Sequence, residues 1–292
     1  MNTVWTDKIR FKDIRKPMFY MGAKVKGAYY DDEQMVGYMP HNYLEDYFTI
    51  KSLDDNNTIT LSKVSSSYNP AFYYSLDNGE SWISNNAQTS ITINNGDTIK
   101  FKATPSYSFN WSFTSTGRYN VYGNSMSLLY GDDFVSKTEL KTGDDILKHL
   151  FYNSTYLVDA GKLMLPATTA RSHCYEGMFE GCTSLVAAPA LPATTIKVQC
   201  YRDMFSGCTS LVAAPELPAL SASENGTYYQ MFYGCSSLNY VKCMLKNSSY
   251  GFGGNNWLYG VAGTGTFVKN KETKGWETGA SGIPEGWTVI DA

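Results

Sequence analysis

The six cysteines are the residues whose type and spacing come closest to a chemical motif. Within each pair the separation is eight residues, too wide for the CxxC arm of a zinc site, and the nearby His173 adds only one further ligand. The recurrence instead favours small apolar residues buried at equivalent places in a repeated unit. A zinc site and structural disulfides are the alternatives to this interpretation. The three pairs are Cys174 and Cys182, Cys200 and Cys208, and Cys235 and Cys243.

Acid–base and nucleophilic catalysis find little support in the polar residues. The acids at 132–133 and at 144–145 are adjacent in each pair, so on a strand they would point to opposite faces. A glycosidase instead needs two carboxylates across a cleft, and helix caps or solvated loops explain these acids better. Ser125 and Ser127 in YGNSMSLLYG do not form a GxSxG nucleophile elbow. The histidines lie in unrelated contexts, at His41, His149 and His173. We therefore expect a non-enzymatic protein with no catalytic residue, cofactor or metal ion.

The net charge and the lack of a long apolar segment argue against two classes of partner, nucleic acid and the membrane. The chain has 24 Lys and Arg against 27 Asp and Glu, a net charge of -3, so nucleic acid is not an expected partner. The N-terminus, MNTVWTDKIRFKDIRKPMFYMG, contains charges every few residues and no apolar core of a secretory signal. We expect neither a signal peptide nor insertion into a membrane. The 23 tyrosines fit either a recognition surface or ordinary strand positions.

A near-identical string occurs twice in the second half of the chain. MFEGCTSLVAAPALPATT begins at Met178, and MFSGCTSLVAAPELPALS begins at Met204. Phenylalanines recur around these strings at intervals of 28, 26 and 27 residues, which indicates about four copies. The four positions are Phe151, Phe179, Phe205 and Phe232. A period of this length is typical of stacked structural repeats.

Each copy predicts a short helix, a glycine turn and a short strand. The helices are expected at CYEGMF, CYRDMF and TYYQMF, and at TGDDILKHLFYN, where Thr142 or Asp144 would cap the helix. Gly181, Gly207 and Gly234 are expected to adopt the left-handed conformation that ends a helix. One copy cannot bury its own Phe and Leu, so we expect the copies to stack around a shared core.

Residues 46–140 predict antiparallel β structure. Period-two alternation marks strands at YFTIKSL, NTITLSKV, AFYYSLD, SITINNG and DTIKFKA, and the pattern extends through FNWSF, YNVYGNSMSLLYG and FVSKTEL. Turn signals separate them at residues 54–57, 77–79 and 94–97, where Asn and Gly supply the positive φ of tight hairpins. Short strands at this spacing favour a small β-sandwich.

The C-terminal residues 248–292 are expected to close the stack. WLYGVAGTGTFVKN and GIPEGWTVIDA predict two short strands, and an open stack of repeats needs a cap. The loop aromatics here are the best candidates for contact with a sugar or a protein loop, and packing within the cap is the alternative. These candidate residues are Tyr250, Phe252, Trp257 and Tyr259.

The repeat resembles a known family. CYEGMFEGCTSLVAAPALPATT is similar to the BspA-like leucine-rich repeats of Bacteroidetes surface proteins. YYSLDNGESW…ITINNGDTIKFKA and WLYGVAGTGTFVKN…GIPEGWTVI resemble the segments that often precede and follow such repeats. The resemblance covers about residues 48–290. It implies a right-handed solenoid with short parallel strands, a role in adhesion or recognition, and no cofactor.

The N-terminal stretch carries a second resemblance. MFYMGAKVKGAYYDDEQMV is similar to pieces found at the start of phage virion proteins, and related repeat proteins occur in phages of Bacteroidetes, including crAss-like phages. We therefore expect a phage structural protein, a head or tail fibre or a decoration protein, located in the virion. Its partners would be other virion proteins, a host-surface protein or glycan, and further copies of itself, a trimer by analogy with fibres. The alternative is a BspA-like adhesin of a bacterial surface.

Together these patterns predict a mainly β fold with short helices in four parts. An N-terminal attachment segment spans residues 1–45 and a β-sandwich-like domain spans 46–140. A short right-handed leucine-rich-repeat solenoid spans 141–247, and a small β cap spans 248–292.

Overall fold

The computed structural model describes ten stretches of the chain and divides the chain into two compact units, Met1–Asn42 and Tyr43–Ala292. The first unit contains a hairpin of β1 (Tyr29–Asp31) and β2 (Gln34–Val36). The described stretches are 29–31, 34–36, 41–64, 70–107, 109–141, 143–222, 226–246, 256–273, 276–279 and 282–292.

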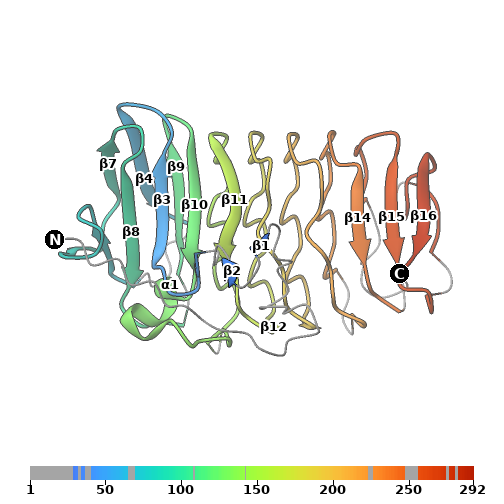
Figure 1. Cartoon of the computed structure of the whole chain (residues 1–292), viewed down its shortest axis with the longest axis horizontal. Helices are drawn as coiled ribbons and strands as arrows, with labels where there is room; N and C mark the ends of the chain where they lie inside the picture. Colours follow the sequence, from blue (N-terminus) through green and yellow to red (C-terminus); the bar gives the residue numbers. More distant parts are fainter. Residues whose placement is uncertain are drawn as a thin grey trace. The chain divides into compact units, whose positions relative to one another are not determined.

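The fold is mainly β, and the second unit begins with two sheets (Figure 1). All neighbouring strands in these sheets are antiparallel except β10 and β11, which are parallel. The three-stranded sheet has the order β7 (Thr89–Ile93), β4 (Asn57–Lys63), β9 (Trp111–Ser115). The six-stranded sheet has the order β11 (Leu157–Met164), β10 (Tyr119–Asn124), β3 (Phe48–Ser52), β8 (Thr98–Ala103), β5 (Phe72–Ser75), β6 (Ile83–Asn85).

Aromatic side chains from both sheets share one core. Phe48 on β3 stacks on Phe113 of β9 with ring centroids 5.2 Å apart, and Phe101 on β8 meets Phe113 edge-on at 5.0 Å. All three rings are fully buried. The period-two alternation of these strands therefore places one face of each sheet against the other.

Only one of the three predicted hairpin turns joins paired strands. Asn78 and Gly79 have positive φ and link β5 to β6, which confirms the turn at 77–79. The turns at 54–57 and 94–97 also contain positive φ, at Asn56 and Gly96, but the strands on either side of each belong to different sheets. Local turn residues set the reversal of the chain, whereas the sheet that receives the next strand depends on packing.

The predicted β pattern of YNVYGNSMSLLYG and FVSKTEL is wrong beyond Asn124. The chain there forms the short helix α1 (Ser127–Tyr130) and the 3-10 helix η1 (Gly131–Asp133). The buried Ser127 hydroxyl donates to the Phe101 carbonyl at 2.9 Å and accepts from the Phe48 N–H at 3.0 Å. These bonds tie α1 to β3 and β8, so a buried hydroxyl overrides the local alternation.

The repeat copies stack on this pair of sheets. Backbone N–H groups of Tyr175, Gly177 and Phe179 donate to carbonyls of Cys200, Arg202 and Met204 one copy further on, at 2.8–3.0 Å. Short parallel pairings link the copies on the other side of the stack, where β12 (Thr169–Ala170) pairs with β13 (Thr195–Ile196). We call the segments that form this backbone ladder the turn segments: 145–153, 173–181, 199–207, 226–234 and 256–260.

The predicted short helices are wrong, because the turn segments are strings of turns. Cys174, Glu176 and Met178 donate their N–H groups three residues back along the chain, and the residues between them donate to the next copy. Every fourth residue takes a left-handed φ, as at His173, Gly177 and Gly181. An α-helix would require bonds to the fourth residue back and right-handed φ throughout. Hydrogen bonds made alternately within a copy and between copies satisfy the backbone N–H and C=O groups that an α-helix would satisfy.

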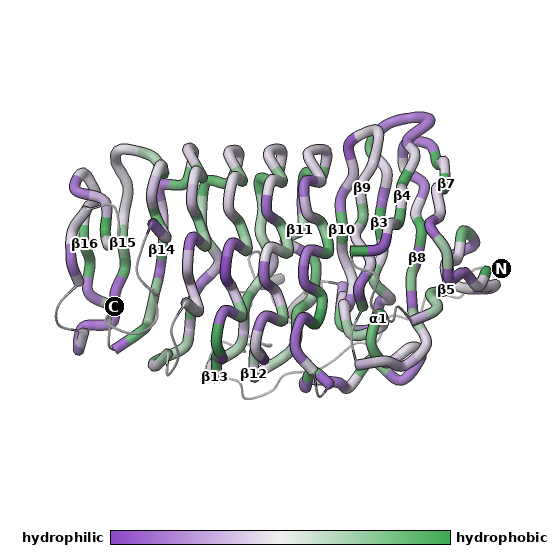
Figure 2. Tube along the Cα trace, turned by 180° about the vertical axis from the view of Figure 1, so that it is seen from behind, coloured by the Kyte–Doolittle hydropathy of each residue, from purple (hydrophilic) through white to green (hydrophobic). Residues whose placement is uncertain are grey.

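The predicted shared core of the repeats is confirmed by two columns of stacked rings. The phenylalanine rings follow one another at 5.2, 5.3 and 5.6 Å, from Phe151 through Phe179 and Phe205 to Phe232. A parallel column of Tyr175, Tyr201 and Tyr228 has spacings of 5.9 Å. Figure 2 shows hydrophobic and hydrophilic stretches recurring from one copy to the next. The nearly identical strings therefore make the same contacts in each copy.

The predicted cap continues the stack. The expected strands are present as β15 (Gly265–Lys269) and β16 (Trp287–Asp291), which form a parallel sheet with β14 (Tyr240–Cys243). The N–H groups of Phe232 and Gly234 donate to the carbonyls of Trp257 and Tyr259 at 2.9 and 2.7 Å, so the turn segment 256–260 is stacked like the others. One buried cluster runs through the parts predicted as separate domains at 46–140, 141–247 and 248–292. Within the described residues, no helix combines the length and apolar character that crossing a bilayer requires.

Candidate functional site

An open cleft lies beside η1, where β8 ends and the chain turns away from the six-stranded sheet. Its volume is about 510 Å³, and its lining includes residues 103–105 and Gly131. Three partly buried aromatic side chains line it, contributed by β5, by the residue before β6, and by the end of α1: Tyr73, Trp82 and Tyr130. The charged residues of the cleft are Lys102, Asp132 and Asp133. We call this set of residues the aromatic cleft.

Lys102 holds the centre of the aromatic cleft together. Its ammonium group lies 4.2 Å from the centroid of the Trp82 ring and 5.9 Å from the centroids of Tyr47 and Tyr73. The same group contacts both carboxylate oxygens of Asp132, at 2.7 and 2.9 Å. The Lys102 side chain is only 14 % exposed, so the cation is largely withdrawn from water and both attractions are stronger than on an open surface.

Tyr47, the residue before β3, also contacts the pair of Lys102 and Asp132. Its hydroxyl donates to Asp132 at 2.7 Å, and its ring meets Trp82 at 4.9 Å. Burial and the neighbouring carboxylate raise the pKa of Tyr47 to about 12. Hydrogen bonds from Lys102 and Tyr47 lower the pKa of Asp132 below its usual value. Asp132 therefore stays ionised and Tyr47 protonated over the whole neutral range.

The loop that carries Trp82 is ordered by its own side chains. Asp77 accepts hydrogen bonds from the Ser75 hydroxyl at 2.7 Å and from the backbone N–H and hydroxyl of Ser81 at 2.9 and 2.5 Å. These bonds lower the pKa of the Asp77 carboxyl. The Gly79 N–H adds a bond to Ser75 at 2.8 Å. Trp82 thus follows a closed turn and does not depend on a ligand for its position.

The other side of the aromatic cleft is held by Tyr130. Its hydroxyl donates to the Glu139 carbonyl at 2.7 Å, and the ammonium groups of Lys137 and Lys141 lie 5.4 and 4.6 Å from its ring centroid. Burial raises the pKa of Tyr130 and, together with Lys137, lowers the pKa of Lys141. Tyr130 is therefore fixed by contacts outside the cleft.

Of the residues predicted from the sequence as ligand contacts, the structure describes Trp257 and Tyr259. Trp257 is wrong as an exposed contact: it is fully buried, its indole N–H donates to the Gly282 carbonyl at 3.1 Å, and Phe267 and Trp276 pack against it. Packing within the C-terminal region, the alternative interpretation, describes this residue. Tyr259 is 50 % exposed and stacks on Tyr233 at 5.4 Å. Tyr250 and Phe252 lie outside the described residues.

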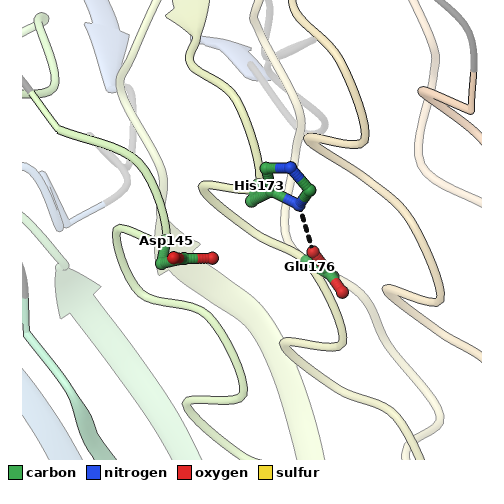
Figure 3. A group of neighbouring side chains, drawn as sticks. All are labelled: Asp145, His173 and Glu176. Carbon is green, nitrogen blue, oxygen red and sulfur yellow. Dashed lines mark hydrogen bonds and ion pairs between the residues drawn. The ribbon is translucent and has the colours of Figure 1, made fainter. Parts of the chain in front are cut away.

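A second group of polar side chains lies on the first two turn segments. His173, Glu176 and Asp145 bring their ligand-type atoms within 4.8 Å of one another (Figure 3). The His173 ring nitrogen Nδ1 and a Glu176 oxygen are 2.5 Å apart. The sequence offered no sign of this group, because Asp145 is 28 residues from His173 and only the stacking of copies places them together.

Lys148 already supplies the cation between these carboxylates. Its ammonium group is 3.3 Å from Asp145 and 3.3 Å from Glu176. A metal ion at this position would have to displace Lys148 and compete with the His173–Glu176 hydrogen bond. The group therefore serves as an ion-pair network that joins neighbouring turn segments, and it carries no cofactor assignment.

The aromatic cleft was missed in the sequence for a related reason. The sequence pattern favours helix caps or solvated loops for Asp132 and Asp133, and η1 places them in a short helical turn. The useful signal was the exposed DNGESW stretch, where a tryptophan follows a tight turn at residues 77–82. Comparisons with protein-family models, with curated proteins and with solved structures each gave no match to this chain.

Proposed function

We propose that the chain is a non-enzymatic structural protein of a phage virion, a head or tail fibre or a decoration protein. In this proposal, a short right-handed leucine-rich-repeat solenoid of the BspA-like type and a β-sandwich-like region display a surface for recognition of the host. Residues 1–45 attach the protein to other virion proteins. The displayed part binds a host-surface protein or a glycan, and several copies assemble together, a trimer by analogy with other fibres.

The observation that carries the recognition role is the continuous column of phenylalanines from Phe151 to Phe232. The repeated strings are accounted for by stacking contacts, so their repetition needs no repeated chemistry. The partly exposed side chains then vary from copy to copy on a constant backbone, as at Glu176, Arg202 and Tyr229. A constant scaffold with variable exposed side chains is typical of binding surfaces built from repeats.

The second candidate function is that of a BspA-like adhesin on a bacterial surface. The similarity of CYEGMFEGCTSLVAAPALPATT to the repeats of surface proteins favours it. Both candidate functions use the same recognition scaffold. They differ only in whether a virion or a bacterial surface carries it. The similarity of residues 18–36 to the start of virion proteins is the reason to prefer the virion.

Fractionation of the native source tests the proposal. We expect the protein to co-sediment with virus particles in a density gradient, and a variant lacking residues 1–42 to fold but to be absent from particles. Circular dichroism of the purified variant checks its folding. Recovery in a membrane fraction free of particles would replace the virion by the adhesin, and incorporation of the shortened variant would remove the attachment role of the N-terminal segment.

A further inference from the structure

We propose that the aromatic cleft binds an uncharged saccharide through the ring of Trp82 and the carboxylates of Asp132 and Asp133. This inference rests on the proposed recognition function and gives it a ligand class and a place in the fold. The site lies in the two-sheet region. It is not in the turn segments, which the repeat pattern would suggest as the binding surface.

The size and walls of the aromatic cleft suit a small ring-shaped ligand. A volume of about 510 Å³ lies within the usual range for small-molecule sites, about 300–1,000 Å³. Trp82, Tyr73 and Tyr130 line the cleft and are only partly buried, so part of each side chain is open to solvent, while Lys102 lies over the Trp82 ring. The electron-rich face of an aromatic ring attracts the weakly positive C–H groups on one face of a pyranose.

The rim of the cleft supplies the hydrogen-bond acceptors that sugar hydroxyls need. The Asp132 side chain is 65 % exposed although two partners hold it, and Asp133 beside it is also exposed. Each ionised carboxylate accepts several hydrogen bonds, and bonds from hydroxyls to a charged acceptor are short and strong. A site with an apolar wall beside fixed hydrogen-bond acceptors therefore fits a saccharide better than it fits a purely apolar ligand.

The charges of the cleft disfavour ionised ligands of either sign. A cationic ligand seeking the aromatic faces would meet the ammonium group of Lys102, which lies 4.2 Å from the Trp82 ring and neutralises Asp132. A phosphate or carboxylate ligand would instead meet the exposed carboxyl group of Asp133. Like charges repel, so an uncharged ligand is favoured.

The cleft is also organised in advance of binding. The Asp77 turn fixes the segment before Trp82, the Lys102–Asp132 pair fixes the carboxylate, and the Glu139 carbonyl fixes Tyr130. Side chains that are already ordered lose little entropy when a ligand binds. This makes affinity for a ligand as polar as a sugar attainable in water.

Binding of purified full-length protein to a panel of neutral disaccharides tests the inference. A broad glycan array first extends the panel. The titrations then use tryptophan fluorescence and saturation-transfer NMR as readouts, and the panel includes maltose, cellobiose, lactose and chitobiose. Choline and glucose 6-phosphate serve as charged probes. We expect a neutral saccharide to bind, and the charged probes to bind more weakly or not at all.

The variants separate the cleft from the rest of the molecule. Trp82→Ala is expected to weaken binding by about tenfold or more, and Asp133→Asn by a smaller factor. Ile83→Ala changes an exposed neighbour of Trp82 that does not line the cleft, and it should bind like the wild type. If Trp82→Ala does not fold, Trp82→Phe keeps an aromatic ring of smaller area and should show an intermediate affinity.

Three results would overturn the inference: no binding of any neutral saccharide, undiminished binding by Trp82→Ala, or tighter binding of choline or glucose 6-phosphate than of a neutral sugar. The outcome is independent of the virion placement. Trp82→Ala should still enter particles if the proposed attachment is correct, whereas loss of particle association with intact saccharide binding would contradict only the virion proposal.

Discussion

At the scale of single residues, the buried thiols show how the repeat uses cysteine. All six cysteines are buried thiols that form no disulfide, as the interpretation of small apolar residues predicts. Three of them also donate a weak S–H hydrogen bond to the phenylalanine carbonyl of the preceding copy: Cys182 to Phe151, Cys208 to Phe179 and Cys235 to Phe205, at 2.9–3.1 Å. A thiol fills the space of a small apolar side chain and satisfies a carbonyl that another apolar residue would leave with one bond fewer.

These thiols predict a loss of stability in alkali. Burial raises the pKa of Cys235 and Cys243 to about 12, from an ordinary value of 9.0. Because the folded pKa is the higher one, the folded state holds the proton more tightly; the stabilisation is complete below pH 9 and is lost as the pH rises towards 12. We expect the melting temperature to fall over this range and Ellman's reagent to label the thiols at pH 8 only after unfolding. Rapid labelling of the native protein would contradict the buried placement.

At the scale of the element, the turn segment depends on a column of left-handed residues. Gly181, Gly207, Gly234 and Gly260 lie one above another with φ of 71–76°. The Cβ that a side chain would add at Gly207 meets only Gly181, at 3.7 Å, so space is not the constraint there. At Gly181 the added Cβ would lie 2.2 Å from the Asn153 side chain. Conformation therefore selects glycine along the whole column, and packing reinforces that selection at Gly181.

Substitutions at these glycines should lower the stability by amounts that follow from conformation at every position and from packing at Gly181. Gly207→Ala is expected to lower the free energy of unfolding by about 1–2 kcal/mol, the usual cost of a left-handed alanine. Gly181→Ala should cost more, because it adds the clash with Asn153. Gly207→Asn should cost less than Gly207→Ala, since Asn153 holds the equivalent place in the first copy with φ 57°. Urea unfolding measures all three, and equal stability of Gly207→Ala and the wild type would contradict the argument.

At the scale of the whole second unit, one residue joins the sheets to the stack. The Phe151 ring packs on Phe48 and Phe113 at 6.0 and 5.9 Å and on Phe179 at 5.2 Å. β10 and β11 are paired across the same boundary. The two regions therefore share a core, and we expect the wild-type unit to unfold in one cooperative transition.

Phe151→Ala should weaken that coupling. Truncating a fully buried phenylalanine costs about 3–5 kcal/mol, and here the cavity lies between the two regions. We expect differential scanning calorimetry to show a broadened or divided transition, with a van't Hoff enthalpy below the calorimetric one. Phe205→Ala, in the middle of the stack, should cost a similar amount and retain one transition. Identical transition shapes for the two variants would contradict a junction at Phe151, and Val212→Ala, at a 49 % exposed side chain, should be nearly neutral.

The sequence by itself determined the features that neighbouring residues encode. Alternation placed β3, β4, β5 and β8 close to their observed bounds, the period of the phenylalanines predicted a shared column, and the recurring glycines predicted left-handed φ. These are local or repeated patterns, so each copy confirms the interpretation of the next. The same local patterns also misled where two backbone arrangements satisfy one pattern, as in the turn segments predicted to be helices.

Only the tertiary structure decided which distant side chains meet. Lys102 and Asp132 are 30 residues apart and Tyr47 and Asp132 are 85 apart, and they meet because β3, β8 and β5 are neighbours in one sheet and η1 ends beside them. Likewise, nothing near Trp257 in the sequence shows that Phe267 and Trp276 cover it. Strand order and burial depend on contacts summed over the whole core, so a binding site made from several strands is not written in any one of them.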